Sequence, residues 1–287
     1  MTPRRTASAA IMFGVFFLGL LVQKFYWLLP VLIYAAGVMC LIELEQLVRL
    51  KSLRFPLAFC LIFTLALMAD GFWSGLDHGM YILVGATILL LTHRVLVSDY
   101  QNLAGEVGAA LLATAYIGLP MGMAAAMSPL ARTDMAPFGK LLLLYQLAVV
   151  FGGDTAAYFI GRKWGKHRFF PKISPRKTIE GAVASVTVSL LLAFVVTASF
   201  PTLRQFFGGW HHGLILGLVL GVMAPLGDLA ESAFKRDAGR KDSGHDFTGH
   251  GGFLDIFDAL LFGLPIQFCY IQLFHHMWSA ASLLPLF

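Results

Sequence analysis

Long apolar runs alternate with short polar segments along almost the whole chain. A helix needs about 20 apolar residues to cross the ~30 Å hydrocarbon core of a membrane, and nine runs reach or approach that length. The expected spans are 8–23, 26–43, 56–74, 79–97, 106–129, 138–160, 181–200, 213–230 and 252–273. The pattern therefore predicts an all-α, polytopic integral membrane protein with about nine transmembrane helices.

The first two runs are shorter than the others and only Gln23-Lys24-Phe25 separates them, so a re-entrant pair is an alternative to two full spans. Arg4 and Arg5 precede the first run, as basic residues do in a signal peptide. No small-x-small cleavage pattern follows that run, however. We therefore expect it to be retained as a helix.

Composition agrees with this reading. The chain is 58% hydrophobic, contains 25 Phe and has only 13% charged residues, whereas soluble domains have about 25%; the mean hydropathy is +0.75. No long polar region interrupts the spans, which favours one membrane-embedded unit with N-terminal helices over 1–130 and a C-terminal region over 131–287. The three cysteines lie in apolar runs, where they are expected to be inert packing residues.

The placement of positive charge predicts how the protein is oriented. With the N-terminus in the cytoplasm, 17 of the 21 Lys and Arg fall on or beside cytoplasmic segments, and the exceptions are Lys24, Arg132, Lys140 and Arg204. Such a bias is the positive-inside pattern. It places the loops 161–180 and 231–251 in the cytoplasm, and an odd number of spans then places the C-terminus outside.

A polar cluster near the C-terminal end stands out against this apolar background. Asp228 and Ser232 are one helical turn apart, with Lys235 and Arg236 a further turn on. Lys241 and Asp242 follow, and then His250 within a glycine-rich turn. Ionisable groups beside apolar spans are costly and indicate a functional site. Carboxylates suit a divalent cation and Lys and Arg suit phosphate, so the cluster suggests phosphoryl or nucleotidyl transfer.

Two further acids begin the last span. Asp255 and Asp258 are three residues apart, so on a helix both project to one side. Carboxylates that close repel one another unless a cation or a proton lies between them. Structural pairing of these aspartates with Lys235 or Lys241 is the alternative to a site role.

A second polar cluster lies between the expected spans 138–160 and 181–200. Asp154 and Tyr158 share one helical face, and seven Lys or Arg follow in a short loop. An anionic-lipid anchor would explain a basic run alone. The segment from Ser174 through Lys177 to Gly181 adds hydroxyls, an ammonium group and a helix start, and this combination suits a phosphate.

Together these motifs resemble the phosphatidate cytidylyltransferase (CDP-diacylglycerol synthase) family. The family signature runs Ser-x-x-Lys-Arg-x-x-x-x-Lys-Asp and then Pro-Gly-His-Gly-Gly-x-x-Asp-Arg-x-Asp. At the family spacing this chain has Ser232, Lys235, Arg236, Lys241, Asp242, Gly249, His250, Gly251, Gly252, Asp255 and Asp258. The match covers roughly residues 150–260, and the first 130 residues match only as generic membrane spans.

Two positions depart from the signature. Thr248 stands where the family usually has Pro, and Ile256 stands where it usually has Arg. The second change removes a guanidinium group from among the acids, and Arg is not readily replaced in bidentate phosphate recognition. These departures are compatible with a divergent paralogue of altered rate or lipid preference.

The resemblance implies a nucleotidyltransferase of phospholipid biosynthesis, which makes CDP-diacylglycerol and diphosphate from CTP and phosphatidate. It implies Asp228, Asp255 and Asp258 as metal ligands, with Asp154 and Asp242 as weaker candidates, and Lys235 among the catalytic residues. The expected substrate-binding residues are Ser174, Lys177, Ser232, Arg236, Lys241 and His250. The expected cofactor is Mg²⁺, with room for a second cation.

The resemblance also sets the expected surroundings of the enzyme. The partners are CTP, phosphatidate in the bilayer and other membrane lipids, with a homodimer as an option and no nucleic acid. The expected location is a bacterial inner membrane, with the site facing the cytoplasm. Two alternatives stay open: a CTP-dependent lipid kinase, and a transporter of anionic solutes. A transporter would carry matching broken helices in both halves, but residues 1–140 contain no matching charged motif.

Overall fold

The structure, a computed structural model, describes residues 14, 18–20, 22–97, 101–240 and 252–281, with side chains described through residue 274. It is mostly helical. The helices are η1 (Gln23–Phe25), α2 (Leu28–Arg49), α3 (Leu57–Ser74), α4 (Gly79–Leu96), α5 (Leu103–Ala126), η2 (Ala136–Phe138), α6 (Gly139–Trp164), α7 (Ile179–Ser199), α8 (Pro201–Phe206), α9 (Trp210–Asp237) and α10 (Leu254–Ala281). Two short strands, β1 (Arg168–Phe170) and β2 (Ser174–Thr178), form a hairpin.

Eight of the described helices are long and apolar enough to cross a membrane. They are α2, α3, α4, α5, α6 with the preceding turn, α7, α9 and α10. This finding confirms the expectation of a polytopic membrane protein. The eight helices overlap the last eight predicted spans, although α2, α9 and α10 extend six to eight residues beyond the predicted ends. The remaining predicted span, 8–23, lies mostly outside the described residues.

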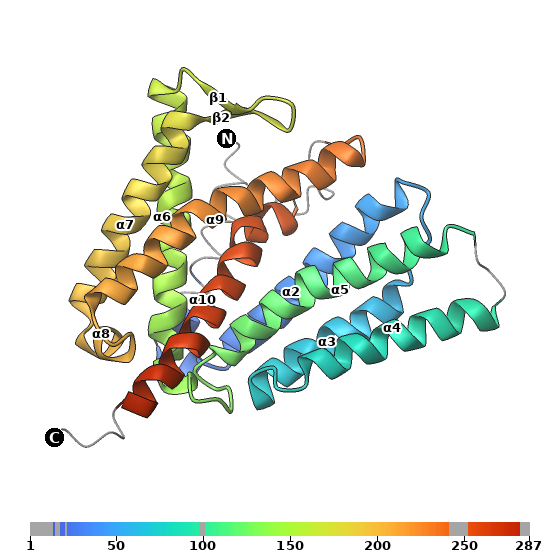
Figure 1. Ribbon diagram of the computed structural model, residues 1–287, viewed down its shortest axis with the longest axis horizontal. Helices are drawn as coiled ribbons and strands as arrows, with labels where there is room; N and C mark the ends of the chain where they lie inside the picture. The colour runs from blue at the N-terminus through green and yellow to red at the C-terminus, as the bar shows by residue number, and fades with distance from the viewer. Residues whose placement is uncertain (1–13, 15–17, 21, 98–100, 241–251, 282–287) are drawn as a thin grey trace.

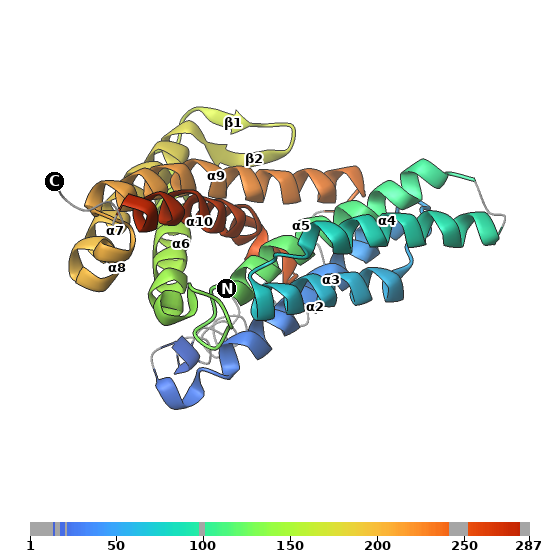
Figure 2. The ribbon, with the colours of Figure 1, turned by 60° about the horizontal axis from the view of Figure 1, so that its bottom comes forward.

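The helices form two groups that meet along α10. Helices α2 to α5 lie on one side, and α6, α7 and α9 lie on the other, with the β1–β2 hairpin beyond the ends of α6 and α7 (Figures 1 and 2). Helix α10 packs on α9 and α6 and also on α5 and α2. Residues more than 200 positions apart in sequence therefore come together at α10.

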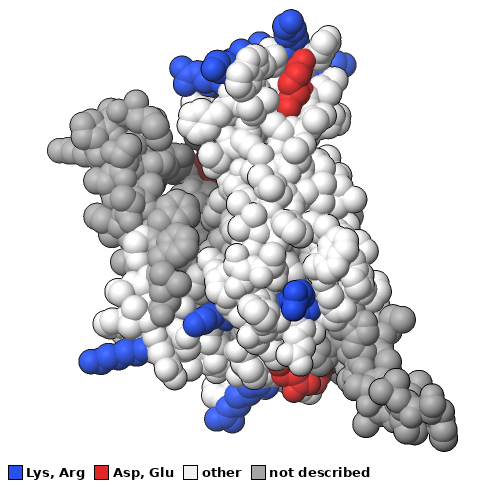
Figure 3. All heavy atoms as spheres, turned by 90° about the vertical axis from the view of Figure 1, so that its left-hand side faces the viewer, with Lys and Arg blue, Asp and Glu red and all other residues white. Residues whose placement is uncertain are grey.

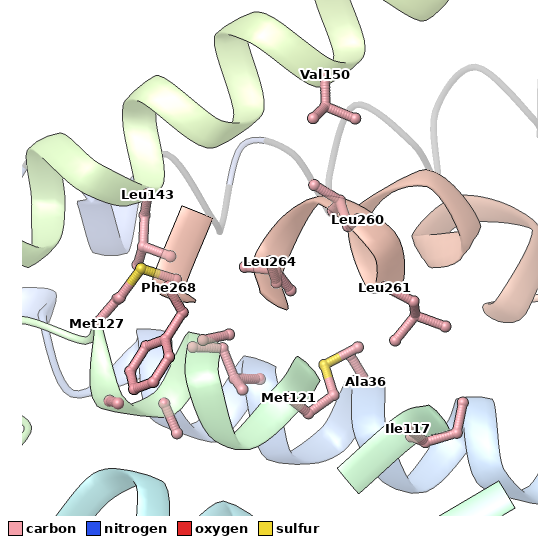
Figure 4. Close-up of a cluster of buried hydrophobic side chains, with 14 of the residues drawn as sticks. Ala36, Ile117, Met121, Met127, Leu143, Val150, Leu260, Leu261, Leu264 and Phe268 are labelled. Carbon is pink, nitrogen blue, oxygen red and sulfur yellow. The ribbon is translucent and has the colours of Figure 1, made fainter. Parts of the chain in front are cut away.

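Apolar side chains from both groups enclose α10. Figure 4 shows Leu260, Leu261, Leu264 and Phe268 on α10 among side chains from α2, α5 and α6. These neighbours include Ala36, Ile117, Met121, Leu143 and Val150, all of them buried. Close packing of this kind stabilises helix association in a membrane, where lipid offers an equally apolar surrounding. The core thus fixes α10 against both helix groups.

The β1–β2 hairpin was not anticipated by the sequence analysis. Its strands are antiparallel, with Arg168 opposite Thr178 and Phe170 opposite Ser174. Thr178 then caps α7, because its side-chain oxygen accepts a hydrogen bond from the Gly181 backbone N–H at 3.1 Å. The segment from Ser174 to Thr178, expected to suit a phosphate, is therefore a strand that leads directly into α7.

Charge is segregated on the face formed by α7 and its neighbours. Figure 3 shows Lys and Arg gathered at the hairpin end, a broad belt free of Lys, Arg, Asp and Glu, and a few charged residues at the opposite end. The exposed basic residues of the hairpin end are Arg162, Lys163, Lys166, Arg168, Lys172 and Arg176. An uncharged belt between two charged ends is the surface expected of a membrane-spanning unit.

Candidate functional site

The close crossing of α9 and α10 brings the predicted acids together. A Cβ atom at Gly227 would lie 2.6 Å from the backbone oxygen of Asp258 and 3.1 Å from Cβ of Phe262. Only glycine lets the two backbones approach so closely. Asp228 follows directly, so this contact sets its carboxylate beside the first turns of α10.

Strand β2 places Lys177 beside Asp228. The Lys177 ammonium lies 2.8 Å from Oδ2 of Asp228 and donates to the Pro225 carbonyl oxygen at 3.1 Å. The Ser232 hydroxyl approaches the other carboxylate oxygen of Asp228 at 3.4 Å. The hairpin and α9, which are about 50 residues apart in sequence, therefore share one polar cluster.

A second lysine links α9 to α10. Lys235 forms ion pairs with Glu231, one turn earlier on α9, and with Asp255 on α10. The other oxygen of Asp255 accepts a hydrogen bond from the Gly252 backbone N–H at 2.7 Å. Glu231 is fully buried and Lys235 is nearly so. Buried charges persist only where opposite charges and hydrogen bonds compensate them, so this arrangement holds the Lys235 ammonium in one place.

Three aspartates from three helices lie within electrostatic reach of one another. Asp258 on α10 interacts with Asp228 on α9 and with Asp154 on α6, and Asp154 interacts with Asp228 and Lys177. Among the residues that the structure describes, no three His, Cys, Asp or Glu side chains are gathered closely enough to hold a metal ion by themselves. Mg²⁺ is commonly held by one or two carboxylates together with substrate phosphates and water. The carboxylate oxygens of this cluster suit that mode of binding.

Other predicted residues lie at the edge of the cluster or outside the described part. Arg236 is exposed and donates to the backbone oxygens of Ile173, at 3.2 Å, and Arg240, at 2.9 Å, which ties α9 to the hairpin. Ser174 is half-buried in β2. Lys241, Asp242 and His250 lie outside the described residues.

Comparison with known proteins identifies the family of the chain. The model of the Cytidylyltransferase family matches residues 3–274. The chain belongs to the cytidylyltransferase family. It is 35% identical over 248 residues to the phosphatidate cytidylyltransferase of Bacillus subtilis (strain 168), covering 85% of this chain and 88% of that protein. It is 32% identical over 269 residues to the phosphatidate cytidylyltransferase of Staphylococcus saprophyticus, covering 91% and 96%.

Membership of the cytidylyltransferase family confirms the resemblance inferred from the signature, and it extends the match into the N-terminal helices. The structure brings together Lys177, Asp228, Lys235, Asp255 and Asp258 from three segments of the chain. Their individual roles stay predictions. The ion pair between Lys235 and Asp255 is the structural pairing that the sequence analysis gave as the alternative to a site role.

The sequence analysis gave no role to two buried acids at this candidate site. Glu231 pairs with Lys235, and Glu43 of α2 contacts the start of α10. Glu231 lies within a Gly-Asp-Leu-x-Glu-Ser stretch that is similar to the family, but for Glu43 the only signal in the sequence was an ionisable residue near the end of an apolar run. That signal could not identify Phe253, which lies 210 residues away, as the partner of Glu43.

Proposed function

We propose that this chain is a phosphatidate cytidylyltransferase that converts CTP and phosphatidate to CDP-diacylglycerol and diphosphate. A phosphate oxygen of phosphatidate attacks the α-phosphorus of CTP and forms a new P–O–P bond. The bond between the α-phosphorus and the bridging oxygen breaks, and diphosphate leaves with that oxygen. The nucleophile belongs to the lipid, so the protein needs to supply only position and charge.

The observation that carries this proposal is the pair of lysines inside a cluster of acids at the meeting point of α9, α10 and β2. Lys177 is held by Asp228, and Lys235 by Glu231 and Asp255. Both ammonium groups are thus oriented before substrate arrives. We infer that triphosphate oxygens replace Asp228 as the partner of Lys177, which frees Asp228 for a cation, and that they join Lys235 while Asp255 stays in contact with it. Both lysines then place positive charge where the departing diphosphate gains negative charge.

A divalent cation, expected to be Mg²⁺, would supply further neutralisation of phosphate charge when bound. Asp228 and Asp258 are the residues we propose to hold it, with Asp154 close enough to contribute to the negative field. Asp255 is already engaged by Lys235 and by the Gly252 N–H. We therefore assign Asp255 the task of orienting Lys235, although the sequence alone suggested a ligand.

The position of the cluster suits a substrate with a phosphate headgroup and acyl chains. The helices beside it present exposed apolar side chains, among them Phe159, Val183 and Val222, along which acyl chains can stay in the bilayer. The basic residues at the hairpin end mark the side that we propose to face the cytoplasm, where CTP is available.

The test is a product assay on purified protein in detergent with CTP, Mg²⁺ and phosphatidate. Cytidylyl transfer predicts CDP-diacylglycerol and diphosphate in equal amounts. A CTP-dependent lipid kinase would instead release CDP, and a transporter would form neither product. Formation of CDP with a phosphorylated lipid, or no turnover in protein shown to be folded, would overturn the proposal.

A further inference from the structure

Glu43 reaches the start of α10 from the N-terminal half of the chain. The residue is only 6% exposed and lies in the C-terminal third of α2. Its Oε1 accepts a hydrogen bond from the Phe253 N–H at 2.8 Å, and its Oε2 accepts one from the Leu254 N–H at 2.8 Å. Both carboxylate oxygens therefore contact adjacent backbone groups.

The chemistry of this contact explains how a buried acid is stabilised here. The first N–H groups of a helix lack partners within the helix and carry partial positive charge. A carboxylate that accepts from two of them makes charge-assisted hydrogen bonds, and two points of contact fix orientation as well as distance. Glu43 thus sets where α10 begins.

A second contact joins the turn after α2 to the end of α9. The Lys51 ammonium, just beyond α2, lies 2.9 Å from Oδ1 of Asp237 and donates to its backbone oxygen at 3.2 Å. Asp237 is the last residue of α9. The end of α9 and the start of α10 therefore both contact the C-terminal part of α2 or the turn that follows it.

The residues held by Glu43 lead directly into the site. Asp255 follows Leu254 and pairs with Lys235, and Asp258 lies one turn further along α10. We propose that Glu43 is a positioning residue for cytidylyl transfer, which acts through the first turn of α10 to set Asp255 and Asp258 against α9. This inference rests on the proposed function, and it gives the N-terminal helices a part in the reaction.

Two substitutions and a matched control test the proposal. Glu43→Gln keeps the size of the side chain but turns an NH₂ group toward one N–H donor, so that one hydrogen bond is lost. Glu43→Asp keeps the charge but is one methylene shorter, so it cannot reach both N–H groups in the same geometry. The control is Glu45→Gln, in the same helix, because Glu45 is 5% exposed and pairs with Arg49.

The measurements are kcat and KM for CTP, the Mg²⁺ concentration for half-maximal activity, the melting temperature, and hydrogen exchange of the peptide that contains residues 252–256. We expect Glu43→Gln to lower kcat/KM by about tenfold to a hundredfold, as small misplacements of reacting groups do. It should also raise the half-activating Mg²⁺ concentration and speed exchange at Phe253 and Leu254. Glu45→Gln should leave kcat/KM and that exchange close to the parent values.

The outcomes separate failure of the Glu43 proposal from failure of the proposed function. A Glu43→Gln protein whose kcat/KM and Mg²⁺ dependence match those of Glu45→Gln would overturn the proposal. If Glu43→Gln is not recovered folded, Glu43→Asp decides, since parental activity and parental exchange in that variant would overturn the proposal equally. A parent protein that makes no CDP-diacylglycerol, while Glu43→Gln still speeds exchange at α10, would refute the proposed function and leave the structural tie intact.

Discussion

Removing the Lys235 ammonium should destabilise the protein and stop the reaction, and the two effects can be separated. The Lys235 side chain is 9% exposed, and its partners Glu231 and Asp255 are 0% and 16% exposed. Lys235→Met keeps the unbranched shape and most of the length of the side chain but leaves both carboxylates without this cation. Removing one partner of a buried ion pair typically costs about 3–5 kcal/mol. We expect the free energy of unfolding to fall by about that amount.

A second substitution isolates the cause of this loss. In the double variant E231Q/K235M the fully buried carboxylate becomes a neutral amide, so the largest uncompensated charge is gone. The free energy of unfolding should recover by about 2 kcal/mol or more. Activity should not recover, because the ammonium group proposed to bind phosphate is still missing.

The assay is unfolding in mixed micelles followed by tryptophan fluorescence, with cytidylyl transfer measured on the same preparations. A Lys235→Met protein within 1 kcal/mol of the parent, roughly the value of an exposed ion pair, would refute the buried-pair reasoning. Return of activity in E231Q/K235M would refute the proposed contact with phosphate and leave Lys235 a purely structural role.

Three further predictions address packing, orientation and the departure at Ile256. Gly227→Ala should cost about 1–3 kcal/mol and lower kcat, because its Cβ would meet the Asp258 backbone oxygen; unchanged melting and rate would contradict the close crossing. In a cysteine-less background, Cys at Arg168 or Arg240 should resist an impermeant thiol reagent on intact cells, while Cys at Lys140 should react. The opposite labelling would invert the orientation. Ile256→Arg should raise kcat/KM for CTP about tenfold, since a hydrogen bond to a charged group is worth about 1.5–3 kcal/mol; an equal or lower value in folded protein would show a site rebuilt around isoleucine.

The membrane architecture was predictable because span length and hydropathy are properties of continuous segments. Helices α3 and α4, for example, begin and end within a residue or two of the predicted limits. The β1–β2 hairpin was not predictable in this way, since its strands, Arg-Phe-Phe and Ser-Pro-Arg-Lys-Thr, are too short to show a clear alternation of polar and apolar positions.

The site was only partly predictable, for a different reason. The spacing of Asp255 and Asp258 placed both at the start of one helix, and the signature associated them with Lys235. The contact between Glu43 and Leu254 depends on how α2 packs beside α10, and no local pattern records a tertiary contact across 211 residues. Likewise, only the fold shows that β2 carries Lys177 to Asp228.

The most direct test of the central claim is transfer of label from α-³²P-CTP to lipid by the parent protein and by Asp228→Asn. Asp228 suits this test because its side chain is 36% exposed, so that the substitution should leave the melting temperature almost unchanged. The account predicts that the parent moves the label into chloroform-soluble CDP-diacylglycerol and that the variant does so about a hundredfold more slowly or worse. Transfer by folded Asp228→Asn at half the parent rate or more would contradict the claim that this cluster is the active site.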